Sequence, residues 1–392
     1  MKIKFGRLSY LLLLFISSYF SIAESIKVRI LTHLKIYQVE FLAERGSYKI
    51  IGDGKDTIQL KAQESITVSK LNDSIEIRKS SGQFLGKFLW LRLCGESAEN
   101  FFSIRTINPE RKKRFYEDHL IIGMDKINNS LRLINWLELD KYIGGVVEAE
   151  AGRKSHPEFY KVQSILARTY ALSIIGRHIT EGHDLCDQVH CQAFYGRTQD
   201  NEILNNVLAT KEIVVVDKDF NLINAVFHSN SGGQTANAED VWGRPTSYLK
   251  SVKDTFSLNM PNYQWSRKMS TEDWLAYLKI KHKITVEDSI TKSNALSFYQ
   301  STRRSSMDIN GKKIPLKIIR SDLNLKSTYF DLRTENDSVI FSGKGYGHGI
   351  GMCQEGAMKM SKLGFSYKEI IKFYYRGIQI INKQQLAFFR EN

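Results

Sequence analysis

The segment Tyr142–Leu172, YIGGVVEAEAGRKSHPEFYKVQSILARTYAL, decides how the second half of the chain folds. Its second part is amphipathic, because apolar side chains recur at the spacing of one helix face, at Phe159, Val162, Leu166, Tyr170 and Ile174. Ser155 is a suitable N-cap, Pro157 follows in the first turn, and Glu158 stands three residues after the cap. The pattern predicts a long helix that begins near Ser155.

Glu150 stands on a glycine-flanked stretch just before this helix, which we expect to be a short turn. A carboxyl group there can perform acid–base chemistry if partial burial raises its pKa. Lys161 and Arg168, which follow on the helix, would oppose that shift unless their charges are directed at a substrate. The alternative is a carboxylate that only interacts with the start of the helix. The local sequence leaves both readings open.

Glu150 is the single carboxylate that stands out in this segment, although Glu148 lies two residues earlier. Hydrolysis of a glycosidic bond usually needs two carboxyl groups. A lytic transglycosylase can act with one, because the C6 hydroxyl of the sugar attacks the anomeric carbon and no activated water is needed. The count of acidic groups is therefore compatible with the second chemistry.

Two thiols and two imidazoles share one short loop, His183-Asp-Leu-Cys186-Asp-Gln-Val-His190-Cys191. Thiolates and imidazoles suit tetrahedral zinc, and four protein ligands leave no open position, so the loop predicts a structural zinc site. The alternative is a Cys186–Cys191 disulfide, which an oxidising compartment permits. The two remaining cysteines are Cys94 and Cys353.

Two further segments are rich in glycine. The first, His228-Ser-Asn-Ser-Gly-Gly-Gln234, follows an apolar strand and predicts a polar groove where a sugar could approach the backbone. An ordinary turn is the alternative, and a serine hydrolase is disfavoured because the G-x-S-x-G elbow is absent. The second, Gly343–Gly356, lacks the Gly-Lys-Ser/Thr ending of a phosphate loop. Its glycines instead allow a tight backbone path that presents His348 and Gln354.

The chain before residue 118 alternates apolar and polar residues in short runs separated by turn signals, IKVRIL, YQVEFL, SYKIIG, TIQLKA, SITVSK and SIEIRK. It contains no cluster of His, Cys and acidic residues. A hairpin, helices and further strands follow, and the last predicted helix is YKEIIKFYYRGI. We therefore expect an α+β protein, with a β-rich accessory domain over 24–117 and a mixed α/β catalytic core over 118–386.

The N-terminus predicts export. Lys2, Lys4 and Arg7 precede an apolar stretch, Leu11–Phe20, and Ser21-Ile22-Ala23 is an acceptable cleavage site, so residues 1–23 are predicted to be a signal peptide. An uncleaved anchor, and with it a membrane contact, is the alternative. We expect the protein in the periplasm or elsewhere in the cell envelope.

The charge of the chain bears on its partners. The 392 residues carry a formal charge of +14, which falls to +11 without the signal peptide. A basic exported protein is not expected to meet nucleic acid, and its anionic partners would be cell-wall glycan or a membrane surface. Solubility alone could also explain the charge.

Five segments together resemble the stage II sporulation protein D family (SpoIID/LytB). They occur in the family's order over about residues 118–386: YIGGVVEAE, YKVQSILARTYAL, DLCDQVHCQAFYG, FHSNSGGQTANAEDVW and GKGYGHGIGMCQEGAM. The resemblance implies a peptidoglycan lytic transglycosylase that cleaves bonds between N-acetylmuramic acid and N-acetylglucosamine. It also implies a preference for glycan strands stripped of stem peptides. Some family members enhance an amidase, so a wall-binding activator of an amidase is the alternative.

The resemblance also assigns residues. Glu150 takes the place of the catalytic acid in G-V-V-x-x-E, and Glu148 falls on a variable position. The zinc ligands would be Cys186, His190 and Cys191, with His183 as the fourth and His178 as its competitor. The substrate-binding residues we expect are Lys161, Arg168, His228, Ser229, Ser231, Gln234, His348 and Gln354. The sequence departs from the family at Ala151-Gly152, where Met-Pro is usual, and at Cys353, where Ser is usual.

Overall fold

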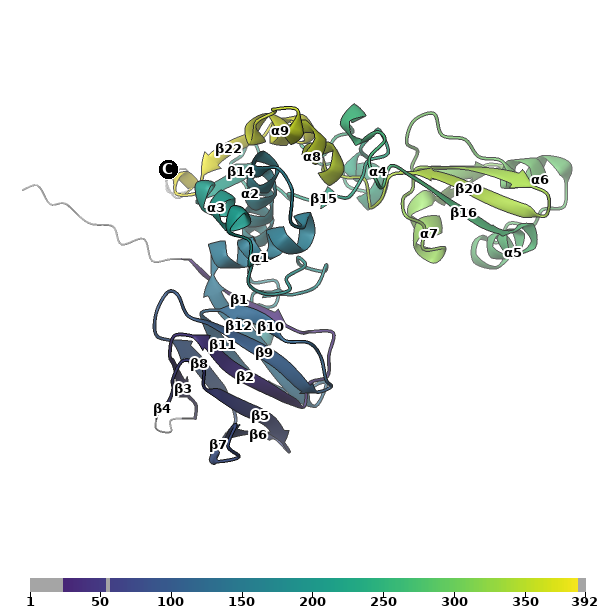
Figure 1. The fold of residues 1–392 in the computed structure, drawn as a ribbon. Coiled ribbons are helices and arrows are strands. Elements are labelled where there is room, and N and C mark those ends of the chain that lie inside the picture. Colours follow the sequence, from purple (N-terminus) through teal and green to yellow (C-terminus); the bar gives the residue numbers. More distant parts are fainter. Residues whose placement is uncertain (1–23, 54–56, 387–392) are drawn as a thin grey trace, which may run out of the picture.

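The computed structural model describes residues 24–53 and 57–386, so the predicted signal peptide lies outside the described residues. Figure 1 shows two β-sheets at the N-terminal end, a helical core above them, and a separate lobe joined to the far side of that core. Helices and strands are both abundant, which confirms the predicted α+β class. No helix among the described residues has the length and apolar character to span a bilayer.

The N-terminal part consists of two sheets that pack face to face. The first has the order β13-β1-β12-β11-β8-β3-β4, and the second β10-β9-β2-β5-β6-β7. The strands of the first sheet are β1 (Ser25–Ile30), β3 (Tyr48–Ile51), β4 (Ile58–Leu60), β8 (Leu91–Gly95), β11 (His119–Asp125), β12 (Ser130–Glu138) and β13 (Leu185–Cys186). Those of the second are β2 (Gln38–Arg45), β5 (Ser65–Leu71), β6 (Ser74–Lys79), β7 (Phe84–Phe88), β9 (Phe101–Asn108) and β10 (Arg114–Glu117).

Alternation along the strands supplies the core between these sheets. In β2 every second side chain is buried, and its Phe41 ring lies 5.0 Å from Phe102 and 5.1 Å from Tyr48 of the opposite sheet. Rings and β-branched side chains in such a layer are the main source of sheet stability. The six strands predicted from the alternation before residue 80 are confirmed.

The predicted hairpin after residue 118 is confirmed, and it belongs to the first sheet. Its strands β11 and β12 pair with each other, while β12 also pairs with β1 and β11 with β8. The expected domain boundary after residue 117 therefore falls inside this sheet. The short strand β13 adds to the same sheet in parallel, with Val28 opposite Leu185 and Arg29 opposite Cys186.

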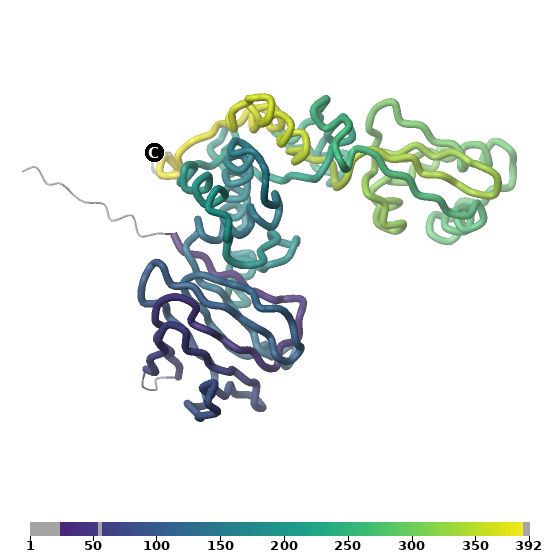
Figure 2. Tube along the Cα trace, in the orientation of Figure 1, coloured from purple at the N-terminus to yellow at the C-terminus, as the bar shows by residue number. Residues whose placement is uncertain are grey.

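The helical core follows directly on β12. It contains α1 (Leu139–Ala151), α2 (Pro157–Ser173), α3 (Asn201–Ala209), α8 (Gln354–Lys362) and α9 (Tyr367–Tyr374). The ribbon in Figure 1 and the tube in Figure 2 both show the C-terminal helices α8 and α9 next to α2. Strands β14 (Ile213–Val216) and β22 (Gln379–Asn382) pair beside them. The expected helix at 201–210 is confirmed, and the one expected at 367–378 is confirmed in its first part, because α9 ends at Tyr374.

Two local predictions around Glu150 are wrong. The expected turn is the end of a helix, since α1 continues through Glu150 and stops at Gly152, whose φ of 67° an L side chain rarely adopts. Position 145 of α1 requires a glycine, because a Cβ there would lie 2.2 Å from the carbonyl oxygen of Gly196. The N-cap of α2 is His156, whose ring accepts the backbone N–H of Glu158, instead of Ser155.

The two glycine-rich segments lie side by side. Strand β15 (Phe227–His228) pairs in parallel with β21 (Met352–Cys353), and single bridges join Asn230 to Tyr346 and Ala236 to Ile350. Between them stands Gly351, with a φ of 69°, where a Cβ would lie 2.1 Å from the carbonyl oxygen of Val226. Close approach of two backbones explains the glycine there. The short helix α4 (Ala238–Trp242) and the 3₁₀ turn Thr255–Ser257 complete this region.

Residues 264–344 form the separate lobe. Its three-stranded sheet has the order β16 (Gln264–Ser270), β20 (Ser338–Lys344), β19 (Phe330–Glu335), and its helices are α5 (Thr271–His282), α6 (Ser289–Leu296) and α7 (Leu316–Asp322). A hairpin of β17 (Ser306–Ile309) and β18 (Lys312–Pro315) packs with them. The lobe has its own apolar core around Trp274, Phe330 and Phe341. The strand expected for KIPLKII is only half correct, because α7 begins directly after Pro315.

Candidate functional site

Glu150 lies at an open cavity of about 270 Å³ between the N-terminal half of the core and the glycine-rich segments. Its carboxyl oxygen Oε1 accepts the backbone N–H of Ala193 at 3.2 Å. The other lining residues come from α2, the Cys/His loop, β15 and the loop before β21: Tyr170, Val189, Cys191, Gln192, Ala225, Val226, Phe227 and His348. The cavity therefore joins four of the segments that the sequence singled out.

The two carboxyl groups of this turn of α1 have opposite electrostatic environments. Burial raises the pKa of Glu150, and the single hydrogen bond from Ala193 offsets only part of that rise. Burial would also raise the pKa of Glu148, but hydrogen bonds from Thr198 Oγ1 and Arg153, both at 2.6 Å, lower it instead. A pair of carboxyl groups with pKa values pushed apart is how proteins separate an acid from a permanent anion.

Two histidines lie behind and beside the cavity. His348 lines it, and its Nδ1 accepts the backbone N–H of Ile350 at 3.0 Å. His228 is buried, donates its Nδ1–H to the carbonyl oxygen of Ile350 at 3.1 Å, and has its ring 5.6 Å from that of His348. Burial lowers the pKa of His348 to about 4 and that of His228 well below its ordinary value. Both rings are therefore neutral near pH 7.

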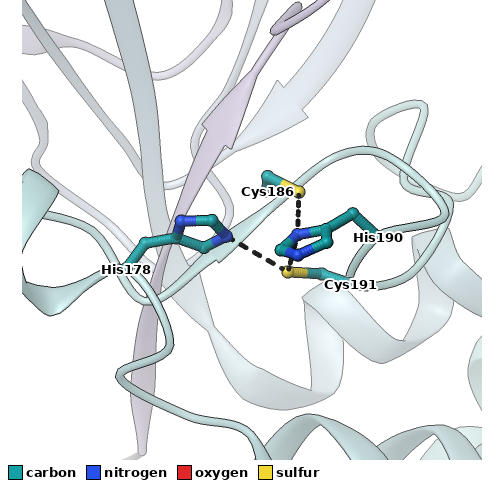
Figure 3. Close-up of side chains that lie close together, drawn as sticks. All are labelled: His178, Cys186, His190 and Cys191. Carbon is teal, nitrogen blue, oxygen red and sulfur yellow. Dashed lines mark hydrogen bonds between the residues drawn. The ribbon is translucent and has the colours of Figure 1, made fainter.

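A group of four side chains could hold a metal ion. The ligand atoms of His178, Cys186, His190 and Cys191 all lie within 4.8 Å of one another. Figure 3 shows the His190 ring between the two sulfurs and His178 pointing at Cys191. Three S···N separations in the group are 3.6–3.8 Å, close to the roughly 3.3–3.8 Å that tetrahedral geometry and zinc bonds of about 2.0–2.3 Å require. The donor set and its spacing thus fit a tetrahedral ion.

The fourth member of this group is His178, whereas the sequence favoured His183. The 3₁₀ turn Ile179–Glu181 and the left-handed Gly182 bring His178 back over the loop. The His183 ring stacks on that of His178, with centroids 4.8 Å apart, and points its Nδ1 to the carbonyl oxygen of Glu181. His183 is therefore a neighbour of the group and does not reach both sulfurs.

The metal group shapes one wall of the cavity. Both cysteines are free thiols, and a hydrogen bond from Cys191 lowers the pKa of Cys186 to about 4. Cys191 itself lines the cavity, and two residues later Ala193 binds the carboxyl group of Glu150. The loop that carries the two cysteines therefore also contacts the carboxyl group of Glu150.

Comparison with known proteins shows which family the chain resembles. The family model described as stage II sporulation protein, SpoIID, matches residues 127–216, which include Glu150 and the metal group. Stage II sporulation protein D of Bacillus amyloliquefaciens is 28% identical over 259 residues, covering 62% of this chain and 74% of that protein. The Bacillus subtilis (strain 168) protein of the same name is 27% identical over the same shares. Residues 127–216 are therefore a SpoIID-family domain, and the similarity to the sporulation proteins extends over most of the chain.

One further relative of this chain bears a different name. The amidase enhancer of Bacillus subtilis (strain 168) is 28% identical over 287 residues. That match covers 59% of this chain but only 39% of the amidase enhancer.

Of the eight expected substrate contacts, His348 lines the cavity and the other seven do not, among them Arg168 and Lys161. Arg168 is only 1% exposed, pairs with Asp140 at 2.9 Å, and donates to the carbonyl oxygens of Thr210, Ile213 and Val207. Lys161 forms an ion pair with Glu158 at 2.6 Å. Arg168 thus joins α2 to α1 and α3, whereas the Lys161 pair lies within α2. Sequence reasoning misplaced Arg168 because a buried guanidinium and a substrate-facing one look alike in a motif.

The polar residues of the glycine-rich segments mostly build the frame behind the cavity. Ser231 is buried and donates to Asp254 at 2.8 Å, and the backbone carbonyl of Ser229 accepts the N–H of Glu355. The side chain of Gln234 bonds Ser251. Gln354 donates to the backbone carbonyl of Glu150 at 3.2 Å, which ties α8 to the end of α1.

Sequence reasoning also missed lining residues. Tyr170, Gln192 and Phe227 face the cavity, and each lies within one of the five quoted segments. Gln192 is nearly buried, and its Nε2 has no hydrogen-bond partner among the described residues. Their position beside motif residues was the only signal, because aromatic and amide side chains in such segments usually belong to the core.

Proposed function

We propose that this protein is a peptidoglycan lytic transglycosylase that cleaves bonds between N-acetylmuramic acid and N-acetylglucosamine in peptide-stripped glycan strands. The proposal is carried by Glu150, a carboxyl group with a raised pKa at the wall of an open cavity. Its neighbour Glu148 is engaged by Arg153 and Thr198 and is not available. The SpoIID-family domain supports a role at the cell wall. The predicted export signal supports a role in the cell envelope.

The chemistry follows from one acid. Glu150 gives its proton to the glycosidic oxygen as the bond from the anomeric carbon breaks. The C6 hydroxyl of the same muramic acid then attacks that carbon, and its proton passes to the Glu150 carboxylate directly or through an ordered water. The product carries a 1,6-anhydro ring, no water is consumed, and Glu150 ends protonated. The N–H of Ala193 supports the carboxylate while it is charged.

His348 is not a rival for the acid role. Its pKa of about 4 leaves the ring neutral near pH 7, and its Nδ1 already accepts the Ile350 N–H. We assign it, with Tyr170 and Phe227, to holding the sugar chain in the cavity. Neutral aromatic and imidazole rings are suited to sugar faces and hydroxyl groups.

We further propose that His178, Cys186, His190 and Cys191 bind a structural zinc ion. Four protein ligands would complete a tetrahedral shell, so the ion would stabilise the loop and contribute no step to the reaction. This chain's own contribution is positional, because the loop carries Cys191, Gln192 and Ala193 to the cavity.

The second candidate function is activation of a cell-wall amidase without catalysis, and the amidase enhancer relative favours it. In that case the cavity would bind glycan and the protein would deliver or stimulate the amidase. The intact Glu150 site favours the enzyme, because a binding module has no need of a carboxyl group with a raised pKa.

Incubation with peptide-stripped glycan separates the two functions. The wild type should release soluble fragments, and Glu150→Gln should slow release by about 10²–10⁴-fold, the usual contribution of a general acid. Glu148→Gln, two residues away on the same helix, is the matched control and should retain most of the activity. Equal release by wild type and Glu150→Gln means the mechanism is wrong. No release by wild type, together with faster hydrolysis by an added amidase, supports the activator.

A further inference from the structure

A second open pocket, of about 350 Å³, lies beside the Glu150 turn of α1. Glu148 and Ala149 of that turn form one wall. The opposite wall comes from the N-terminal sheet and the loop before α3, through Arg114, Tyr195 and Arg197 among others. The pocket thus brings the accessory β region next to the proposed cleavage site.

The pocket has an excess of positive charge. The run Arg111–Arg114, RKKR, enters β10 at its rim. Nearby acidic groups are already neutralised, since Glu148 pairs with Arg153 at 2.6 Å and Glu117 with Arg197 at 3.3 Å. Lys113 pairs likewise with Glu44 of the second sheet.

Arg114 is the cation left over. The structure gives it no carboxylate partner among the described residues, and its buried Nη1 has no partner there besides the neutral hydroxyl of Tyr116. The guanidinium lies 5.4 Å from the centre of the Tyr195 ring, within the range of a cation–π contact. A planar guanidinium with unused donors is the group that binds a carboxylate most specifically.

Tyr195 adds a sugar-sized apolar face. It is 56% exposed although it lies between two pocket walls. An exposed tyrosine offers both a flat apolar surface and a hydroxyl, which suits a ring with apolar and polar sides. The pocket therefore combines one surface for a sugar ring with one donor for an acid group.

The pocket and the Glu150 cavity are lined by neighbouring residues of one short loop. Cys191 and Gln192 line the cavity, and Tyr195, three residues beyond Gln192, lines the second pocket. Glu150 and Ala149 face the two sites from adjacent positions of α1. The two sites are thus built from neighbouring residues of the same helix and the same loop.

We propose that this pocket is a second subsite, in which Arg114 binds the carboxylate of an acidic sugar on the strand that Glu150 cleaves and Tyr195 contacts its ring. The inference rests on the proposed function for the identity of the strand. It predicts that the pocket prefers peptide-stripped strands to peptide-bearing ones. A free lactyl carboxylate on muramic acid is an anion, whereas the lactyl group that carries a peptide is a neutral amide.

Binding is measured with the full-length Glu150→Gln protein, so that no strand is cleaved and a failure of catalysis does not affect the result. The probes are peptide-stripped glycan and the same glycan with its lactyl carboxylates converted to amides. Arg114→Gln and Tyr195→Ala should each weaken binding to the first by about tenfold, the loss of one charge-assisted or ring contact. Arg114→Gln should leave binding to the amidated strand unchanged. Tyr195, being exposed, can be truncated without loss of folding.

The controls are Arg333→Gln and Tyr299→Ala, exposed residues of the same types in the separate lobe, which should change neither affinity. The inference is overturned if Arg114→Gln acts no more strongly than Arg333→Gln, or if it weakens both strands equally. It is also overturned if polyglycerol phosphate competes as well as the carboxylate strand, since the site would then be a general polyanion patch.

Discussion

Glu148 and Glu150 lie two residues apart on one helix, yet their surroundings give them different chemistry. Glu148 receives hydrogen bonds from Arg153, Thr198 and the backbone of Gln199, which hold it ionised. Glu150 receives one, from Ala193, and otherwise faces the cavity. An acid that must hold its proton until a substrate arrives needs the second environment.

The raised pKa of Glu150 predicts how Glu150→Gln changes stability. The folded protein holds this proton more tightly than the unfolded chain, whose glutamate pKa is roughly 4.3. The stabilisation is therefore complete below that value and is lost as the pH rises through the folded pKa. Glutamine keeps the shape and does not titrate, so the variant should be more stable than wild type near neutral pH.

Urea unfolding of the two proteins at about pH 4 and about pH 7 checks this sign. We expect the variant's advantage to be larger at the higher pH. An equal difference at both values would show that Glu150 titrates alike in the folded and unfolded chains.

Arg168 is predicted to act on stability. Its guanidinium pairs with Asp140 and donates to three backbone carbonyl oxygens from a position 1% exposed. Arg168→Ala should lower the free energy of unfolding by about 3–5 kcal/mol, because it leaves a partly buried carboxylate and carbonyls unpaired. Arg168→Lys should recover only part of this, since an ammonium lacks the planar fork. A normally stable Arg168→Lys protein with a selectively raised KM would instead indicate a substrate contact.

At the scale of elements, the loop at 178–193 would link the proposed zinc site to the proposed acid, Glu150. His178→Ala or Cys186→Ser should weaken zinc binding by at least roughly 10–100-fold, the loss that removal of an outer partner already causes. His183→Ala, whose ring only stacks on that of His178, is the matched control and should keep the ion. Metal content of the purified proteins checks the ligands.

Removal of the ion by a chelator should lower the Tm and slow cleavage together, because Ala193 would lose its fixed position beside Glu150. Retention of metal by Cys186→Ser and its loss from His183→Ala would contradict the assignment. A chelator that abolishes cleavage without any change in Tm would contradict the structural role.

Prediction from sequence succeeded for elements whose pattern is local. Period-2 alternation gave the first six strands of the two sheets, and apolar spacing gave α2. The helical state of the Glu150 turn was missed because Gly144 and Gly145 suggest a turn. The two glycines are needed within α1 because the chain at Gly196 and Thr198 packs closely against them. This contact joins residues far apart in the sequence, so no local pattern reveals it.

At the scale of the molecule, residues 264–344 are predicted to fold alone. Gln264 and Lys344, the first residue of β16 and the last of β20, are paired, so the lobe enters and leaves the core at one point. It also has a separate apolar core. The isolated segment should unfold cooperatively in urea with a stability of ~3–5 kcal/mol, as expected for this size. A broad, non-cooperative transition would mean that the lobe depends on the core.

The arrangement of the whole molecule was the part that sequence could predict least. That Glu150, His348 and Cys191 line one cavity depends on parallel pairing of β15 with β21 and on the metal loop, which join residues far apart in the chain. The five ordered segments identified most of these residues as a set. Only the three-dimensional contacts show which of these residues line the cavity and which are buried behind it.

The central claim is that Glu150 drives cleavage without the use of water. Digestion of peptide-stripped glycan in oxygen-18 water, followed by mass spectrometry of the new ends, tests it directly. We expect 1,6-anhydro ends that contain no oxygen-18 and that disappear with Glu150→Gln. Reducing ends that carry oxygen-18 would show hydrolysis and contradict the account.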